Sequence, residues 1–253
     1  MATSGTFDAE ERKANLLITL ERDGAIRMND AATSLGVSSM TIRRDLDDLE
    51  AEGLLRRVRG GAVSILGPRP FNERRAVRLR AKEAIAEKSA PLIPRSGAIA
   101  LDASTTAGTI GMRLGPQAGL TIATNSYENF ATLRNTAGVT PVLVGGEAEE
   151  NTDSFVGLIA CHAAASMLYQ RFFVSASAVD TSHGTSEVSL LESQVKRAFA
   201  ATSKELVLCI DSSKLQQQSV ALCFPLTEIS LMITELDPRD SRLDEYRELI
   251  ELR

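Results

Sequence analysis

The amino-acid sequence predicts two domains, an N-terminal winged helix-turn-helix and a C-terminal α/β domain built on a mostly parallel sheet. In the N-terminal part, a short helix, a tight turn, another helix and an Arg-Gly-Gly hairpin follow one another closely. In the remainder, short apolar runs alternate with helical stretches, which is typical of a parallel sheet covered on both faces. At 253 residues the chain is long enough for two hydrophobic cores.

The segment SILGPRPFNE lies between these two patterns. It is rich in Pro and Gly and has neither helical nor strand periodicity, which favours an interdomain connection. We therefore assign residues 1–66 to the winged helix-turn-helix, residues 67–82 to a linker with a linker helix, and residues 83–253 to the larger domain.

Three helices are expected in the N-terminal domain. Residues 9–22 carry apolar side chains near helical spacing, and Gly24 is expected to end this helix. Asn29 is expected to cap a short second helix, and Gly36 to begin the tight turn after it. In the third helix, residues 38–53, three apolar side chains share one face, and they are Ile42, Leu46 and Leu49.

A two-stranded hairpin, the wing, is expected over residues 54–63, with Gly60 and Gly61 in its turn. Beyond the linker, a charged amphipathic helix is expected over residues 73–93. The apolar runs expected to form the strands of the parallel sheet are IALD, TIATN, PVLVGG, RFFVSA, LVLCID and ISLMIT.

The charge is divided unevenly along the chain. Residues 1–82 carry 15 Lys and Arg against 12 Asp and Glu, whereas the remaining residues carry 13 against 21. No acidic residue occurs from Gly53 to Asn72, a segment that holds four arginines. A basic strip of this kind is what contact with DNA phosphates requires, although the whole chain has a net charge of −5.

The third helix is the candidate for reading DNA, because the major groove accepts one helix whose first residues reach the base edges. The candidate DNA-binding residues are Ser38, Ser39, Met40, Thr41, Arg43 and Arg44 on this helix and Arg57 and Arg59 on the wing. Composition alone equally supports an ordinary surface helix in which Arg43 pairs with Asp47 and Arg44 with Asp48. The combination of helix, turn, paired arginines and hairpin favours DNA binding.

The segment TIRRDLDDLEAEGLLRRVRGGAV closely resembles the DNA-binding motif of DeoR-family transcriptional regulators. The family's third helix reads Thr-Ile-Arg-Arg-Asp-Leu with a further Leu three residues later, as Thr41 to Leu46 and Leu49 do here, and its wing ends in Gly-Gly-Ala-Val, as Gly60 to Val63 do. Arg59 stands where many members carry His, which keeps the wing positive. The resemblance implies a repressor of a carbohydrate-utilisation operon.

The rest of the chain resembles the family's effector domain, which is similar in fold to ribose-5-phosphate isomerase. The resemblance implies that a phosphorylated sugar is the effector and that it releases the operator. The matching segments are LDASTT, TNS, VGG, ESQVKRA and IDSSK. Each is expected to follow a strand, and open parallel sheets bind ligands beyond the carboxyl ends of their strands.

The candidate effector-binding residues are Asp102, Ser104, Thr105, Thr106, Thr124, Asn125, Ser126, Gly145, Gly146, Asp180, Gly184, Glu187, Lys196, Asp211 and Lys214. Ser104 to Thr106 begin a helix after a strand, so their hydroxyl and N–H groups can surround a phosphate. Lys196 and Lys214 are expected to balance its charge, and Asp102 and Asp211 to accept hydrogen bonds from sugar hydroxyls.

Each of these assignments has a plainer alternative. The hydroxyls of Ser104 to Thr106 can simply cap a helix. Gly145 and Gly146 can form an ordinary turn. His183 is more typical of an exposed loop, and His162 of a helix surface or a core, than of a ligand site.

An enzyme is the second function that the sequence allows, namely a sugar-phosphate isomerase with an added DNA-binding domain. Isomerases of this fold carry a run resembling Asp-Gly-Ala-Asp-Glu where residues 174–180 read VSASAVD, which keeps only the last acid. The sequence therefore predicts a regulator without catalytic residues, cofactor or metal. The three cysteines, Cys161, Cys209 and Cys223, have no metal-ligand spacing and are expected to be packing residues.

The expected partners are double-stranded operator DNA, a phosphorylated sugar and further copies of the chain, as a homodimer or homotetramer, because helix-turn-helix proteins usually bind palindromic sites. The N-terminal residues MATSGTFDAEERK do not resemble a secretory signal, and no apolar stretch is long enough to span a membrane. The cytoplasm is therefore the expected compartment.

Overall fold

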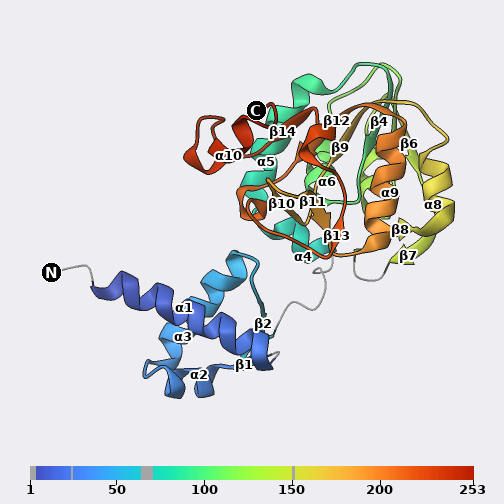
Figure 1. The fold of residues 1–253 in the computed structure, drawn as a ribbon. Coiled ribbons are helices and arrows are strands. Elements are labelled where there is room, and N and C mark those ends of the chain that lie inside the picture. Colours follow the sequence, from blue (N-terminus) through green and yellow to red (C-terminus); the bar gives the residue numbers. More distant parts are fainter. Residues whose placement is uncertain (1–3, 24, 64–70, 150–151) are drawn as a thin grey trace. The chain divides into compact units, whose positions relative to one another are not determined.

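A computed structural model describes residues 4–23, 25–63, 71–149 and 152–253. The chain divides into two units, Met1–Pro68 and Arg69–Arg253 (Figure 1). Among the described residues, no helix is long and apolar enough to cross a bilayer.

The first unit is a winged helix-turn-helix, as predicted. Its elements are α1 (Ser4–Asp23), β1 (Ala25–Arg27), α2 (Met28–Ser34), α3 (Ser39–Ala51), β2 (Arg56–Val58) and β3 (Gly61–Val63). The buried face of α3 consists of Ile42, Leu46 and Leu49, as its spacing predicted, and it packs against Leu16 and Leu20 of α1. Gly60 takes a φ of +90° in the turn of the wing.

Three details of this unit differ from the sequence-based expectation. The first helix begins earlier than expected, at Ser4, and Gly24 lies outside the described residues. Asn29 does not cap α2, because that helix begins at Met28 with Arg27 before it. Strand β1 was not predicted, and it pairs with β3 to make a three-stranded antiparallel sheet in the order β1-β3-β2.

The second unit contains a parallel six-stranded sheet in the order β14-β12-β9-β4-β5-β6. These strands are β4 (Gly97–Leu101), β5 (Leu120–Thr124), β6 (Val139–Leu143), β9 (Tyr169–Val174), β12 (Ser203–Cys209) and β14 (Leu231–Ile233). Each coincides with an apolar run from which a strand was predicted. The order reverses between β4 and β9, so a ligand crevice is expected at the carboxyl ends of these two strands.

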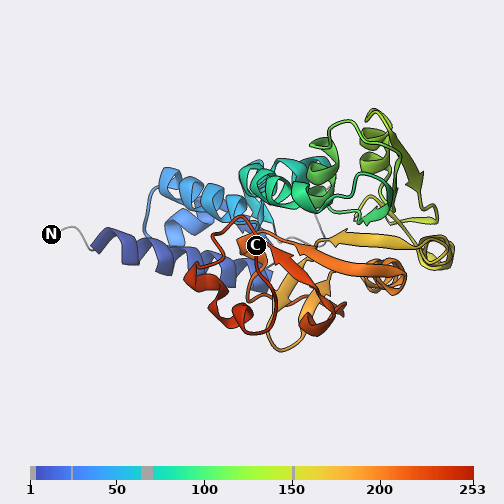
Figure 2. The same cartoon turned by 90° about the horizontal axis from the view of Figure 1, so that it is seen from above.

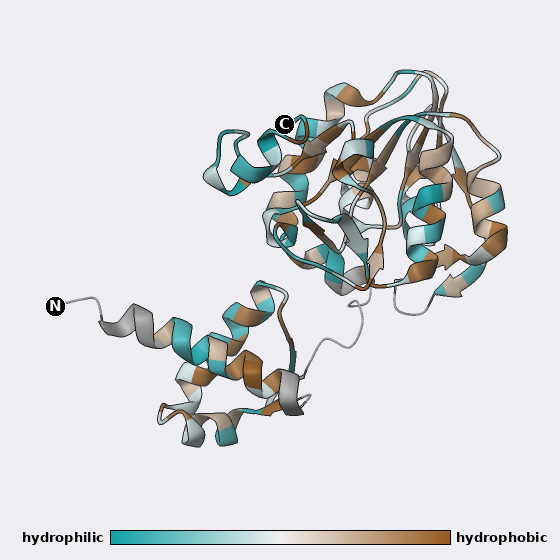
Figure 3. Cartoon of the chain, viewed as in Figure 1, coloured by the Kyte–Doolittle hydropathy of each residue, from teal (hydrophilic) through white to brown (hydrophobic). Residues whose placement is uncertain are grey.

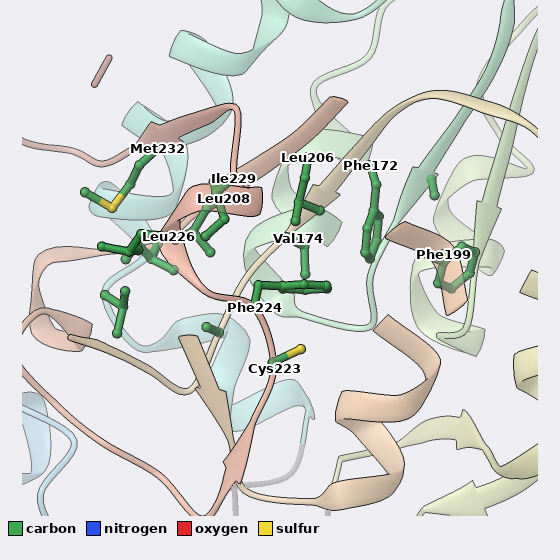
Figure 4. Close-up of a cluster of buried hydrophobic side chains, with 14 of the residues drawn as sticks. Phe172, Val174, Phe199, Leu206, Leu208, Cys223, Phe224, Leu226, Ile229 and Met232 are labelled. Atoms are coloured by element: carbon green, nitrogen blue, oxygen red, sulfur yellow. The ribbon is translucent and has the colours of Figure 1, made fainter. Parts of the chain in front are cut away.

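Helices cover both faces of this sheet (Figure 2). The first face carries α5 (Leu79–Ser89), α6 (Thr105–Met112) and α7 (Tyr127–Leu133), and the second carries α8 (Gly157–Ala164) and α9 (Leu190–Ala201). Successive strand residues point to opposite faces, so Phe173 packs toward α5 and α6 whereas Phe172 packs toward α9. Figure 4 shows the core on the second face, where Phe172 lies near Phe199 of α9.

Smaller elements complete the second unit. A hairpin of β7 (Glu147–Glu149) and β8 (Ser154–Val156) precedes α8, and β10 (Ala178–Asp180), β11 (Gly184–Glu187) and β13 (Ala221–Leu222) form an antiparallel sheet. The short helices are α4 (Phe71–Ala76), α10 (Asp244–Arg247) and the 3-10 turns at 90–92, 212–214, 226–228 and 241–243.

The helix expected over residues 73–93 is broken. Helix α4 ends at Ala76 and α5 begins at Leu79, because Arg78 between them adopts the left-handed conformation with a φ of +52°. Residues 71–82, expected to be linker and linker helix, instead pack into the second unit, where Phe71 and Lys82 are buried.

The cysteines are free among the described residues. Cys209 and Cys223 are buried and Cys161 is half-buried, and burial raises the pKa of both buried thiols to about 12. This agrees with the packing role expected from the sequence.

Candidate functional site

The start of α3 presents a basic, exposed surface. Arg43 and Arg44 are exposed, and neither forms an ion pair or hydrogen bond within the described part of the chain. Their expected intrahelical partners are turned elsewhere, since Asp47 lies 3.3 Å from Arg57 and Asp48 lies 2.8 Å from Lys13. The alternative of a helix surface closed by Arg43–Asp47 and Arg44–Asp48 pairs is therefore wrong.

The hydroxyl groups at this helix start have structural roles. Ser38 is the N-cap of α3, and its Oγ accepts a hydrogen bond from the backbone N–H of Thr41. Thr41 is half-buried and its hydroxyl lies 2.9 Å from that of Ser38. Ser39 and Met40 remain exposed, and Met40 is 57% accessible. The exposed surface at the helix start thus consists of Ser38, Ser39, Met40 and the two arginines.

The two wing arginines differ. Arg59 is exposed, as phosphate contact requires. Arg57 is only 19% exposed and its guanidinium faces Asp47 of α3, so it is partly neutralised and its expected role as a phosphate ligand has less support from the structure. The neighbouring Arg56 is exposed and was not among the predicted contacts.

Asp45, the acid of the Thr-Ile-Arg-Arg-Asp-Leu segment, faces inward and fixes α3 on α1. Arg12 of α1 donates two hydrogen bonds to its carboxylate, at 2.5 and 2.9 Å, and the Asp45 residue is 4% exposed. Sequence reasoning missed this pair, although the position of Asp45 beside Leu46 and Leu49 placed it near the core-facing side of the helix. Asp45 therefore positions α3 on α1 and faces away from the exposed side of the helix.

Replacing Asp45 with Asn should therefore destabilise the first unit by about 1–3 kcal/mol, because the amide keeps the shape but leaves the charge of Arg12 without its carboxylate. Urea unfolding monitored by circular dichroism measures this change. The exposed Asp30→Asn variant is the control and should stay within about 0.5 kcal/mol of the wild type. Equal stability of the two variants would contradict the anchoring role.

The second candidate site lies at the reversal of strand order, where Asp102 follows β4. Its carboxylate accepts hydrogen bonds from the backbone N–H groups of Ser104 and Ser175, at 3.0 and 2.9 Å, and lies 3.1 Å from Nζ of Lys196. Asp102 is fully buried. It therefore ties the ends of β4 and β9 together.

Lys196 of α9 is enclosed by this group. Its ammonium lies 2.5 Å from Glu187 as well as 3.1 Å from Asp102, and it donates to the backbone oxygen of Ser175 at 2.8 Å. Burial lowers the pKa of Lys196, but the carboxylates of Glu187 and Asp102 raise it more, so it lies above its ordinary value. The three donors of the ammonium are thus committed to the protein, which leaves Lys196 poorly placed to balance a phosphate.

Other predicted residues hold the strand ends in place. Ser104 and Ser126 are N-caps of α6 and α7, so the capping alternative holds for Ser104. Thr124 and Asn125 are buried, and the amide of Asn125 donates to the backbone oxygen of Phe155 at 3.1 Å. Asn129, which was not predicted, donates to the backbone oxygens of Asp102 and Ser104.

The predicted glycines fall into two groups. A Cβ on Gly146 would lie 2.4 Å from the backbone oxygen of Val156, and one on Gly184 would lie 2.1 Å from that of Phe224. Both take positive φ values, of +152° and +78°, so internal packing alone requires glycine there. Gly145 faces open space, which leaves room for a ligand.

Asp180 and His183 lie at the turn of the β10-β11 hairpin. Asp180 accepts hydrogen bonds from the N–H groups of Ser182 and His183, and His183 is 53% exposed in its side chain. Glu187 is three strand residues away from Gly184, or about 10 Å. The structure therefore separates the turn that holds Asp180 and His183 from the buried group around Lys196. His162 is exposed on α8, as one of its plainer alternatives predicted.

Asp211 and Lys214 lie at the carboxyl end of β12. Near them lie Arg78, Lys82 and Arg74, which were not among the residues predicted from the sequence. Arg78 lies 2.7 Å from Asp211 and 2.8 Å from Glu235. Burial lowers the pKa of Lys82 to about 8; Asp211 opposes this shift, whereas Lys214, Arg74 and Arg78 lower the pKa further. Arg78 thus pairs with both acids, and Lys82 lies close enough to Arg78, Lys214 and Arg74 for their positive charges to act on it.

Arg74 lies between this basic group and the buried carboxylates of Asp102 and Glu187. Burial lowers its pKa, while the carboxylates of Glu192, Asp153, Asp102 and Glu187 raise it. Its guanidinium donates to the backbone oxygen of Thr152 at 2.6 Å, and its own backbone oxygen accepts a hydrogen bond from Lys82. Arg74 and Lys82 belong to the broken helix α4–α5 and follow no strand, so the strand-end pattern did not point to them.

Comparison with known proteins agrees with both units. Residues 12–66 match a family model described as a DeoR-like helix-turn-helix domain, and residues 77–236 match one described as the DeoR C-terminal sensor domain. The chain is 31% identical over 233 residues to the uncharacterized HTH-type transcriptional regulator YulB of Bacillus subtilis, covering 90% of each chain. It is 29% identical over 246 residues to the lactose phosphotransferase system repressor of Lactococcus lactis, covering 95% of this chain and 96% of the repressor.

Among solved structures, ribose 5-phosphate isomerase A from Neisseria gonorrhoeae aligns with 54% of this chain and 53% of its own, at 15% identity and a TM-score of 0.37. The two relatives from Bacillus subtilis and Lactococcus lactis are named as a transcriptional regulator and a repressor, and not as enzymes.

Proposed function

The chain belongs to the DeoR family of DNA-binding transcriptional regulators, and from that premise we propose that it represses a carbohydrate-utilisation operon until a phosphorylated sugar binds its second unit. The observation that carries the ligand proposal is the proximity of Lys82 to Lys214, Arg74 and Arg78, beside the carboxyl end of β12, where Arg78 itself pairs with Asp211 and Glu235. A sugar phosphate carries about two negative charges at neutral pH, and such a group of cations is suited to balance them.

For the phosphate we propose a position between this basic group and the start of α6. The N–H groups at a helix start favour an anion, and Thr105 and Thr106 lie in the first turn of α6. Lys82 and Lys214 replace Lys196 as the proposed counter-charges, because Lys196 is already neutralised by Asp102 and Glu187.

For the sugar hydroxyls we propose Asn125, Asp211 and the open space beside Gly145. In this proposal the buried group of Asp102, Glu187 and Lys196 shapes the floor of the crevice. The ligand can shift the equilibrium away from the DNA-bound conformation only by the difference between its affinities for the two conformations.

On the DNA side, we propose that Ser39, Met40, Arg43 and Arg44 contact the major groove and Arg59 a phosphate of the backbone. A single winged domain reaches limited affinity, so the proposal includes a homodimer or homotetramer that presents two or more such helices. A regulator of this kind acts in the cytoplasm, where its operator lies.

The pH dependence of effector binding tests the phosphate proposal. With a pKa of about 8, Lys82 is mostly protonated at pH 7 and mostly neutral at pH 9. The affinity for the sugar phosphate that binds best in a panel of pentose and hexose phosphates should therefore fall about tenfold between these pH values. Isothermal titration calorimetry measures this change.

In the Lys82→Met variant the affinity should be lower at pH 7 and nearly constant up to pH 9. The exposed Lys204→Met variant is the control and should follow the wild type. If no member of the panel binds the wild type, or if Lys82→Met retains the same fall with pH, the proposed phosphate site is wrong.

A further inference from the structure

One side of the second unit exposes seven large aliphatic side chains. They are Leu158 and Ile159 on α8, Val188 before α9, Leu190 and Leu191 on α9, and Val220 and Leu222 at β13, and we call them the α8/α9 patch. Leu158 is 76% exposed, Leu190 67% and Val220 86%. Isolated exposed aliphatic residues are ordinary, but such a group on adjoining elements indicates a binding surface.

Hydrogen bonds place these elements side by side. The hydroxyl of Ser193, in the first turns of α9, donates to the backbone oxygen of Leu222 at 2.7 Å. On the other side of α9, Glu192 accepts hydrogen bonds from the hydroxyls of Thr152 and Ser154, next to the start of α8. Figure 3 shows hydrophobic residues in the first turns of both α8 and α9, at the same edge of the unit.

The patch is separate from the core of the second unit. The inner face of α9 already supplies Val195 and Phe199 to that core, and the inner face of α8 supplies Ala160 and Ala164. Leu190 and Leu158 therefore add hydrophobic surface outside the helix faces that the sheet covers. None of the seven residues takes part in the proposed effector site or the proposed DNA interface.

The size of the patch matches one half of a dimer interface. Counting ~100 Å² for a fully exposed aliphatic side chain, the seven residues expose roughly 400 Å². Two copies would then bury roughly 800 Å², which is the apolar share of an interface of ~1,200–2,000 Å² in total.

Charges flank the patch with opposite signs. Glu147 of β7 is exposed and packs against Gly157 at the start of α8. Arg197 lies on the other side of α9, where its guanidinium donates to the backbone oxygens of Leu222 and Cys223. If two copies are related by a two-fold axis parallel to α9, the α8 side of one copy faces the β13 side of the other, and Glu147 then faces Arg197 of the second copy.

We propose that the α8/α9 patch is the two-fold interface through which two copies of this chain associate. The proposal rests on the proposed function in one respect, that a palindromic operator requires paired DNA-binding units. The proposed partner is a second copy of the same chain, because a two-fold axis brings the apolar patch against its own copy and the acidic side of one copy against the basic side of the other.

Sedimentation velocity of the full-length protein tests this interface. The wild type should sediment as a dimer or larger assembly at micromolar concentration. Leu190→Asp buries a carboxylate at the centre of the patch and should raise the dissociation constant of the pair at least 100-fold. Leu158→Asp, on the neighbouring helix, should have an effect in the same direction.

Leu168→Asp is the matched control, because Leu168 is 83% exposed but lies outside the patch, just before β9. It should associate like the wild type. Thermal unfolding followed by circular dichroism should give similar midpoints for all variants, since each replaces an exposed side chain.

Association of Leu190→Asp and Leu158→Asp at the wild-type concentration would overturn this interface and leave the proposed regulator intact. A monomeric wild type would overturn it as well. Failure of the effector proposal is recognised separately, by calorimetry with the sugar phosphates, and the patch variants should bind these as the wild type does.

Discussion

Replacing Lys196 with methionine is expected to destabilise the second unit by about 3–5 kcal/mol. The ammonium lies 2.5 Å from Glu187 and 3.1 Å from Asp102, and all three side chains are buried. Methionine fills a similar volume but leaves two carboxylates without their counter-charge. Urea unfolding followed by circular dichroism measures this destabilisation, and the exposed Lys204→Met variant should stay within about 0.5 kcal/mol of the wild type.

Combining Lys196→Met with Glu187→Gln should recover part of this stability, because one of the two unpaired charges is then removed. The pair of variants also distinguishes two roles for Lys196. A Lys196→Met protein with wild-type stability that no longer responds to sugar phosphate would contradict the buried ion group and restore Lys196 as a phosphate ligand.

Replacing both Arg43 and Arg44 with alanine is expected to weaken binding to operator DNA about 100-fold, since removing one arginine that binds a base or phosphate costs about 1–3 kcal/mol. Both side chains are exposed and without partners among the described residues, so their removal should leave stability nearly unchanged. Fluorescence anisotropy measures the affinity, with a duplex selected from a random library by the wild-type protein.

The dependence of this affinity on salt concentration should also become shallower, by about one unit of slope for each DNA phosphate that an arginine no longer neutralises. The control replaces two exposed arginines of the second unit, Arg134 and Arg239, and removes the same charge. Equal binding by the two double variants would contradict the assignment of α3 as the reading helix.

The main features of the fold could be predicted from the sequence because they depend on local periodicity. The apolar runs at β4, β5, β6, β9, β12 and β14 form parallel strands that are covered on both faces. Such strands are recognisable as continuous hydrophobic runs, without knowledge of which strand lies beside them. Strand β1 spans three residues, Ala25–Arg27, and exists only because β3 lies beside it. The break at Arg78 likewise depends on distant partners, Asp211 and Glu235.

The sequence predicted where many of the candidate site residues lie better than it predicted what each of them contacts. Strand ends pointed to Asp102 and Asp211, because parallel strands bring their carboxyl ends to one edge. The sequence does not say which acid a lysine meets, so Lys196 was expected to face a ligand when it faces Glu187. Arg74 and Lys82 were missed because their helix was expected to be a linker, although a lysine beside Ala81, Ile85 and Ala86 was a sign of partial burial.

A phosphorylated sugar is expected to control the affinity of this regulator for its operator. The most direct test titrates each member of a panel of pentose and hexose phosphates into the complex of the protein with its selected duplex, and follows fluorescence anisotropy. At least one phosphorylated sugar should release the DNA in a saturable way, and its unphosphorylated form should do so only at much higher concentration. Release by none of them, or equal release by the phosphorylated and unphosphorylated sugars, would contradict control by a sugar phosphate.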